Sequence, residues 1–326
     1  MRSFGRTAWL GRFFRWRADL LLLLAVLLAL FSGLSGQFAS GANFISILNQ
    51  AAPLAVAAIG QTFVIAGGGL DISVGSVAAA CAILGSLAAV RGGAPAGMLV
   101  FLAVGVLLGS VNGAVVARFR VQPVIATIAM MTFARGLAFE VSGGQPVSGL
   151  PALFTSIGWG SWLGIPLMVW IALLLVAVAH VALTSTTFGT YVRAAGSAAD
   201  ALRLGGVHAD GYRWLSYVVS GGAVAFAAIL FTAQAGSGQP NLGVGLELQT
   251  IAASVIGGTS LGGGRGSVLG AAGGALVMTI LADGMVMVGV TPYVQQVVLG
   301  VAMILAVVWD YALRRWMRER VGEGVA

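Results

Sequence analysis

The sequence predicts an all-α, polytopic integral membrane protein with about ten transmembrane helices. Of its 326 residues, 59% are hydrophobic and 8% are charged, whereas a soluble domain has about one quarter charged residues. Apolar runs long enough to cross a bilayer, about 20 residues each, recur from Leu20 to Tyr311. No stretch is polar enough to form a separate soluble domain, so residues 1–326 are expected to be one transmembrane domain.

Loops and helix-breaking residues divide the chain into ten candidate spans. Two short candidates, Val74–Val90 and Leu248–Leu261, either cross the membrane or enter and leave on one side. In order, the ten are Ala18–Gly36, Phe44–Ala66, Val74–Val90, Gly97–Ala117, Pro123–Val141, Pro166–Leu183, Trp214–Gln234, Leu248–Leu261, Ser267–Ala282 and Thr291–Tyr311.

The first candidate span has two interpretations. Five arginines precede the apolar run Leu20–Phe31, a pattern that signal peptides share with first membrane spans. The run continues into SGLSGQF without an Ala-x-Ala cleavage site, which favours a retained span.

The basic residues, all of them arginine, predict the orientation. If the N-terminus is cytoplasmic, every arginine except Arg91 and Arg135 falls on the cytoplasmic side, as the positive-inside rule requires. The expected cytoplasmic segments are 1–17, 184–213 and 312–326. The uncharged segment Ser142–Gly164 is expected to be an ordered loop at the outer interface. The positive-inside rule thus explains the excess of arginine that gives the net charge of +7. No nucleic-acid partner is therefore expected.

Two glycine-rich stretches predict broken or re-entrant helices. Gly67–Ser76 reads GGGLDISVGS and Gly257–Ser267 reads GGTSLGGGRGS. Each follows a Gln-Thr pair and leads into Gly-Ser-Val, so the two arise either by internal duplication or by chance in glycine-rich sequence.

Asp71 lies in the first of these stretches. A carboxylate costs about 2.5 to 3.5 kcal/mol at the centre of a span, so Asp71 needs a partner, water or the membrane edge. A helix that starts at Ile72 would make Asp71 its N-cap, which accepts backbone N–H groups. The alternatives are a direct ligand for substrate or cation, and a hydrogen-bonded contact within the bundle.

Neutral amides and hydroxyls inside the spans favour a path for a neutral polyol. Each of them alone is more commonly a contact between helices. Arg135 should face the bundle interior or a water-lined path. The sequence favours neither a structural nor a functional role for it over the other. The candidate path residues are Asn49, Gln50, Gln61, Asp71, Asn112, Thr132, Arg135, Gln249 and Gln295.

Signatures of catalysis are absent from the sequence. A P-loop needs lysine, and the chain has none. The two histidines, His180 and His208, do not make a metal-binding set, and Cys81 is expected to be a buried structural thiol. We therefore expect no enzyme activity, metal or cofactor on this chain, and active transport needs another chain or an ion gradient.

The polar segment 184–213 predicts a cytoplasmic docking element. Residues 194–204 are expected to form a short helix with Asp200 and Arg203 on one face, ended by Gly205 and Gly206. Such a helix between spans suits binding of a soluble partner.

Four stretches of the chain resemble the permease subunits of ribose/xylose-type sugar ABC importers. Within them, the Gly-Gly-x-Asp-x-Ser-Val-Gly core is fairly specific to that family. In order they are GQTFVIAGGGLDISVGS, GSVNGAVVARFRVQPVIATIAMMTFARG, FGTYVRAAGSAADALRLGGV and GLELQTIAASVIGGTSLGGGRGSVLGA.

The resemblance implies that residues 189–207 couple to an ATP-binding cassette subunit, which would hold ATP and Mg. It also implies a periplasmic sugar-binding protein, a second permease chain, and a location among the lipids of the bacterial inner membrane. The expected substrate is a neutral monosaccharide, with a pentose slightly favoured. Most members of the family have Asn at the position of Ser197. The coupling residues implied are Arg193, Ala194, Gly196, Ser197, Ala198, Asp200, Leu204 and Gly205.

Two other functions fit the same sequence. A related nucleoside-type ABC permease would bind nucleosides in place of sugars. An ion-coupled secondary transporter would use Asp71, Arg135 and Glu140 as coupling charges, and its uptake would fail when the ion gradient collapses.

Overall fold

The computed structural model describes residues 6–305 and 308, with side chains from residue 19 onward. The described chain is mostly helical, which confirms the all-α prediction, and its strands β1 (Ser161–Trp162) and β2 (Ile165–Pro166) form one short antiparallel pair. The predicted tail 312–326 lies outside the described residues. The helices are α1 (Arg6–Leu34), α2 (Gly41–Ala66), α3 (Val74–Ala117), α4 (Pro123–Ser142), α5 (Ala152–Trp159), α6 (Leu167–Ser185), α7 (Thr187–Ser197), α8 (Ala199–Leu204), α9 (Ala209–Ala235), α10 (Leu246–Ile256) and α11 (Val268–Met287).

Six of the described helices are long and apolar enough to cross a membrane: α2, α3, α4, α6, α9 and α11. Shorter apolar helices cover Asp19–Leu34 within α1, α10, and Pro292–Leu305. The chain is therefore a polytopic membrane protein, but the predicted number of about ten crossings is not confirmed by these helices.

The 44-residue helix α3 is a helical hairpin. Its backbone turns at Gly93, which has a left-handed φ of 81° two residues before Pro95. The two halves pack together, since a Cβ at Gly97 would lie 2.9 Å from the Cα of Ala89. The sequence marked these halves as separate candidates, because glycine and proline interrupt helices.

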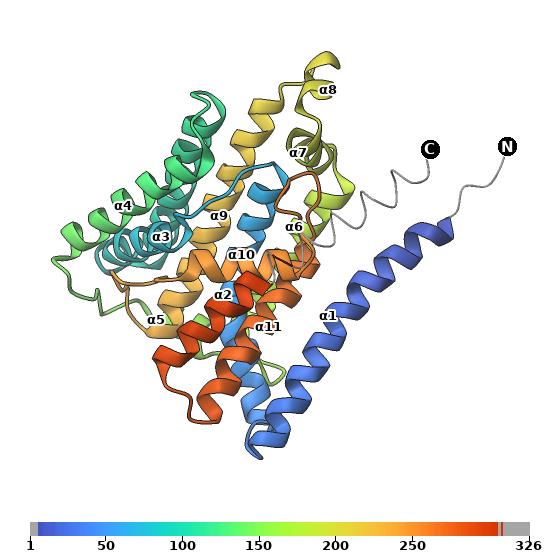
Figure 1. Cartoon of the computed structure of the whole chain (residues 1–326). Helices are drawn as coiled ribbons and strands as arrows, with labels where there is room; N and C mark the ends of the chain where they lie inside the picture. The colour runs from blue at the N-terminus through green and yellow to red at the C-terminus, as the bar shows by residue number, and fades with distance from the viewer. Residues whose placement is uncertain (1–5, 306–307, 309–326) are drawn as a thin grey trace.

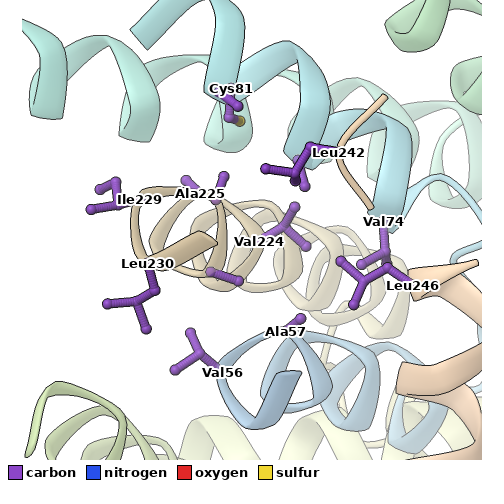
Figure 2. Close-up of a cluster of buried hydrophobic side chains, with 14 of the residues drawn as sticks. Val56, Ala57, Val74, Cys81, Val224, Ala225, Ile229, Leu230, Leu242 and Leu246 are labelled. Carbon is purple, nitrogen blue, oxygen red and sulfur yellow. The ribbon is translucent and has the colours of Figure 1, made fainter. Parts of the chain in front are cut away.

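The centre of the bundle is α9, which packs most extensively against α3 and then α2. Figure 2 shows Val224, Ala225 and Leu230 of α9 among side chains of these neighbours. Small residues bring the helices close: a Cβ at Gly109 would lie 3.0 Å from the Cα of Gly221. Cys81 is buried in this core, as expected for a structural thiol.

Two helix breaks separate α2 from α3 and α10 from α11. We call residues 67–73 break one and residues 257–267 break two; both lie where the glycine-rich stretches predicted an interruption. With 11 residues, α10 is about 16 Å long, roughly half the 30 Å hydrocarbon core of a bilayer. The candidate Leu248–Leu261 therefore does not cross the membrane as one helix.

The two ends of α9 carry different elements. Helices α7 and α8 lie at one end, and α5 lies at the opposite end (Figure 1). The predicted interfacial loop Ser142–Gly164 contains α5 and β1, with Trp159 and Trp162 exposed, and β2 follows it directly. Helix α1 packs on α11 at the side of the bundle (Figure 1).

Candidate functional site

Loops that the arginine pattern places on the cytoplasmic side meet at the α7–α8 end of the bundle, which we call the basic end. Arg120 of the α3–α4 loop, Arg203 of α8 and Gly67 of break one line a common cavity of 390 Å³. Break two reaches the same end, because Gly264 contacts Ser197 of α7. These segments therefore lie at one end of the bundle, and the side of the membrane that this end faces stays a prediction.

The predicted coupling helix over residues 194–204 is two helices, so that prediction is corrected. Helix α7 begins earlier, at Thr187, because the Thr186 hydroxyl accepts the N–H of Gly189 at 3.2 Å. It ends at Ser197, and Ala198 has non-helical angles of φ −147° and ψ 50° before α8 begins. Alanine favours helix, so the residue type did not reveal this boundary.

Ion pairs fasten α8 to the start of α9. Arg203 contacts Asp200 at 3.1 Å, which confirms that the two share a helix face, and contacts Asp210 of α9 also at 3.1 Å. Arg213 lies 3.9 Å from Asp210 and donates to the carbonyl of Ala195 at 2.9 Å. These pairs are largely exposed, so each contributes about 0–1 kcal/mol and serves mainly to orient α8.

The eight predicted coupling residues divide into exposed and packed groups. Ser197, Ala198, Asp200, Leu204 and Gly205 are exposed, with Leu204 at 91%. Arg193, Ala194 and Gly196 are half-buried, and Arg193 donates to the carbonyl of Gly189 within its own helix at 3.2 Å. The exposed group is available to a partner, whereas the packed group contacts this chain.

Gly196 lies where α7 meets both breaks, a contact that we call the α7–break junction. A Cβ at Gly196 would overlap the carbonyl oxygen of Ala66 and lie 2.7 Å from the amide nitrogen of Gly264. It would also lie 3.0 Å from the amide nitrogen of Gly68. Break two is also bonded to the end of α2, immediately before break one, because the N–H of Gly264 donates to the carbonyl of Ala66 at 2.9 Å. A movement of α7 would therefore act on both breaks.

Asp71 is 3% exposed at the centre of a polar cluster. One carboxylate oxygen accepts the backbone N–H and hydroxyl of Ser73 at 2.9 and 2.6 Å. The other accepts the hydroxyl of Ser220 on α9 at 3.4 Å, and the amide of Asn112 donates to Ser73 at 2.8 Å. Helix α3 begins at Val74 with Ser73 in the N-cap position, so the placement of Asp71 as N-cap is corrected by two residues.

Tyr217 gives a second bond between α9 and break one. Its hydroxyl donates to the carbonyl of Leu70 at 3.2 Å. The sequence analysis did not select Tyr217 or Ser220. Their spacing of three residues places them on one face of an apolar helix. This spacing is the sequence signal from which the two residues could have been selected.

One path candidate, Gln50, lies near a buried carboxylate, Asp283 of α11. Gln50 donates to it at 3.5 Å, and Asn43, which the sequence analysis did not select, donates at 2.9 Å. The side-chain oxygen of Asn49, another path candidate, is buried without a hydrogen-bond partner among the described residues.

Gln61 is fully buried in α2, and neither its amide oxygen nor its amide nitrogen has a hydrogen-bond partner in the described part of the chain. Leaving a buried polar group unpaired costs about 1–3 kcal/mol. This amide therefore has unused capacity to donate to and accept from a hydroxyl-rich ligand.

The other path candidates are dispersed. Arg135 donates to the carbonyls of Pro240 and Leu242, at 2.9 and 2.8 Å, and so ties α4 to the loop before α10. Thr132 is exposed and bonds to its own helix, while Gln249 and Gln295 are half-buried on separate helices. Of the predicted set, the structure brings only Asp71 and Asn112 into one hydrogen-bonded cluster, and the remaining path assignments stay predictions.

Comparison with known proteins gives the family. Residues 43–307 match the family described as the branched-chain amino acid transport system permease component. The ribose import permease protein RbsC of Haemophilus influenzae is 37% identical over 306 residues, covering 92% of this chain and 94% of that protein. The chain belongs to this family of transport permeases.

Other relatives are named for different substrates. The galactofuranose transporter permease protein YtfT of Escherichia coli is 37% identical over 266 residues, covering 81% of this chain and 78% of that protein. The autoinducer 2 import system permease protein LsrC of Salmonella choleraesuis is 32% identical, covering 90% and 85%. No solved structure gives a significant match.

Proposed function

We propose that this chain is the transmembrane subunit of an ABC importer for a neutral monosaccharide. A separate ATP-binding cassette subunit would hold ATP and Mg, and a periplasmic protein would deliver the sugar. The observation that carries the proposal is the α7–break junction, which connects the predicted docking helices to both interruptions of the bundle. Relatives that import ribose and galactofuranose support the substrate class.

The proposed topology has about ten crossings with both termini cytoplasmic. In this arrangement the two halves of α3 cross separately, and α10 crosses together with break two. The meeting of Arg120, Arg203 and break two at one end supports it, because these loops are cytoplasmic under the positive-inside rule. The cytoplasmic segments are then 1–17, 184–213 and 312–326.

In the proposed mechanism, the ATPase subunit binds the exposed residues of α7 and α8, which are Ser197, Ala198, Asp200, Leu204 and Gly205. Nucleotide and sugar can shift the access equilibrium only if they contact its two states unequally. Helix α7 would make these contacts unequal. A displacement of Ser197 would move the neighbouring Gly196, which packs against the backbone of both breaks.

The sugar path is proposed to use uncharged amides, with two permease chains enclosing it. Gln61 is the strongest candidate for a sugar contact because its amide is buried and unpaired among the described residues. Asp71 is assigned a structural role, since its carboxylate is occupied by Ser73 and Ser220.

Reconstitution in liposomes tests this function. The chain, its ATPase and its binding protein should import a monosaccharide when ATP is supplied, and import should persist after ion gradients are collapsed. Uptake by the chain alone that stops with the gradient would identify a secondary transporter. Import of nucleosides in place of sugars would identify the nucleoside-type permease.

A further inference from the structure

A second cavity at the basic end opens between the C-terminal end of α3 and the N-terminal end of α9. Its volume is 720 Å³, and its lining includes Arg118, Arg120, Arg203 and Trp214. It adjoins the smaller cavity that reaches break one, because Arg120 and Arg203 line both.

Two of the cavity arginines are not neutralised by carboxylates. Arg203 is already paired with Asp200 and Asp210. Arg118 and Arg120 are exposed, and within the described part of the chain neither lies within 4.0 Å of a carboxylate oxygen. The cavity therefore presents two free guanidinium groups, each able to donate several hydrogen bonds to an anion.

An exposed apolar stripe of α3 leads away from these arginines. Leu107, Val111, Ala114 and Arg118 are spaced by four, three and four residues, so they lie along one face of the helix. Leu107 is 62% exposed and Val111 is 42% exposed, while Ala114 lines the cavity. The arginine-lined cavity thus continues into an apolar surface that can pack against a hydrocarbon chain.

Trp214 places the cavity at the boundary between membrane and water. It begins the predicted span Trp214–Gln234, is 37% exposed, and donates its indole N–H to the carbonyl of Ser110 at 3.1 Å. Tryptophan is enriched at the level of lipid headgroups, where one edge is polar and the rest is apolar.

We propose that this cavity binds an anionic phospholipid, with its phosphodiester between Arg118 and Arg120 and an acyl chain along Leu107 and Val111. Charge complementarity selects the anionic headgroup. The apolar stripe selects a lipid over free phosphate, since phosphate has no hydrocarbon to cover Leu107 and Val111. The proposal requires that α3 and α9 lie in the membrane, and it is independent of the ATPase partner.

Native mass spectrometry of the full-length chain in detergent tests the proposal, with phosphatidylglycerol or phosphatidylcholine added in titration. The test variant combines Arg118→Gln with Arg120→Asn, because Asn tolerates the left-handed φ of 56° at residue 120. A matched control combines Arg91→Gln with Arg265→Gln, which removes the same charge from exposed residues elsewhere. A second variant, Leu107→Ser, keeps both arginines.

The wild-type chain and the control should retain phosphatidylglycerol in preference to phosphatidylcholine. The Arg118/Arg120 variant should bind phosphatidylglycerol about 25-fold more weakly, since each arginine near an anionic headgroup contributes on the order of fivefold. Leu107→Ser should weaken lipid binding by several-fold. The effect of added inorganic phosphate on lipid binding should be the same for this variant as for the wild type.

Three results would overturn the lipid site. They are equal losses in the test variant and the control, displacement of the lipid by millimolar inorganic phosphate alone, and unchanged lipid binding by a variant that no longer associates with the ATPase in a separate pull-down. The last result would assign the arginines to a protein contact. Because the measurement uses the chain alone, failure of the lipid site leaves the sugar-import proposal standing.

Discussion

Break one and break two have similar sequences, but different hydrogen-bonding groups hold them in place. Break one is fixed by side chains, because Asp71 bonds to Ser73 and Ser220 while Tyr217 bonds to Leu70. Break two is fixed chiefly by backbone groups, with the N–H of Ser260 donating to the carbonyl of Arg265 at 3.1 Å. The difference indicates that break one is the anchor, held more firmly in the bundle, whereas break two is the mobile segment, which follows a movement of α7 further.

The largest loss of stability is expected from Asp71→Ala in break one. The change leaves the buried groups of Ser73 and Ser220 without their acceptor and should lower the free energy of unfolding by about 2–3 kcal/mol. Asp71→Asn keeps one acceptor oxygen and should lower it by less. Unfolding in mixed micelles measures both, with Asp200→Ala as an exposed control. An equal effect of Asp200→Ala and Asp71→Ala would remove the distinction between the breaks.

Gly196→Ala tests the junction that joins the breaks. The added methyl group overlaps the carbonyl of Ala66, so backbone must shift at a cost of about 1–3 kcal/mol. Gly205→Ala is the matched control, since its Cβ would lie 3.4 Å or more from any neighbour. Thermal unfolding of the two variants should differ clearly, and indistinguishable curves would mean that α7 is not packed into the breaks.

Thr259→Val removes a side-chain bond of break two. The Thr259 hydroxyl accepts the N–H of Ser267 at 3.3 Å, and the valine keeps the volume. The expected loss is about 0.5–1.5 kcal/mol, smaller than for Asp71→Ala because backbone bonds remain. A loss larger than that of Asp71→Ala, measured in the same micelles, would reverse the assignment of anchor and mobile segment.

Leu204→Ser should have the smallest effect on stability, within about 0.5 kcal/mol, because the side chain is 91% exposed. Its association with the ATPase subunit should nevertheless weaken about tenfold, as expected for an apolar contact at a docking surface. Pull-down titration against the purified ATPase measures this. Unchanged association would exclude Leu204 from the docking surface.

The glycine-rich stretches allowed the sequence to predict both breaks and the turn within α3, because glycine and proline act locally. It did not predict the division of α7 from α8, since Ala198 is not a helix breaker by type. It also did not pair Asp71 with Ser220, 149 residues away, because such contacts depend on how whole helices pack. The amides chosen for a sugar path share a residue type, which does not determine the helix face on which each one lies.

The central claim is that α7 transmits the state of an ATPase through Gly196 to both breaks. The most direct measurement is the number of sugar molecules imported per ATP hydrolysed by the reconstituted complex, for Gly196→Ala against Gly136→Ala. Gly136 of α4 is the control because an added Cβ there would have no described atom within 4 Å. The account predicts that Gly196→Ala still hydrolyses ATP but imports little sugar, whereas Gly136→Ala resembles the wild type. An unchanged ratio in a well-folded Gly196→Ala complex would contradict it.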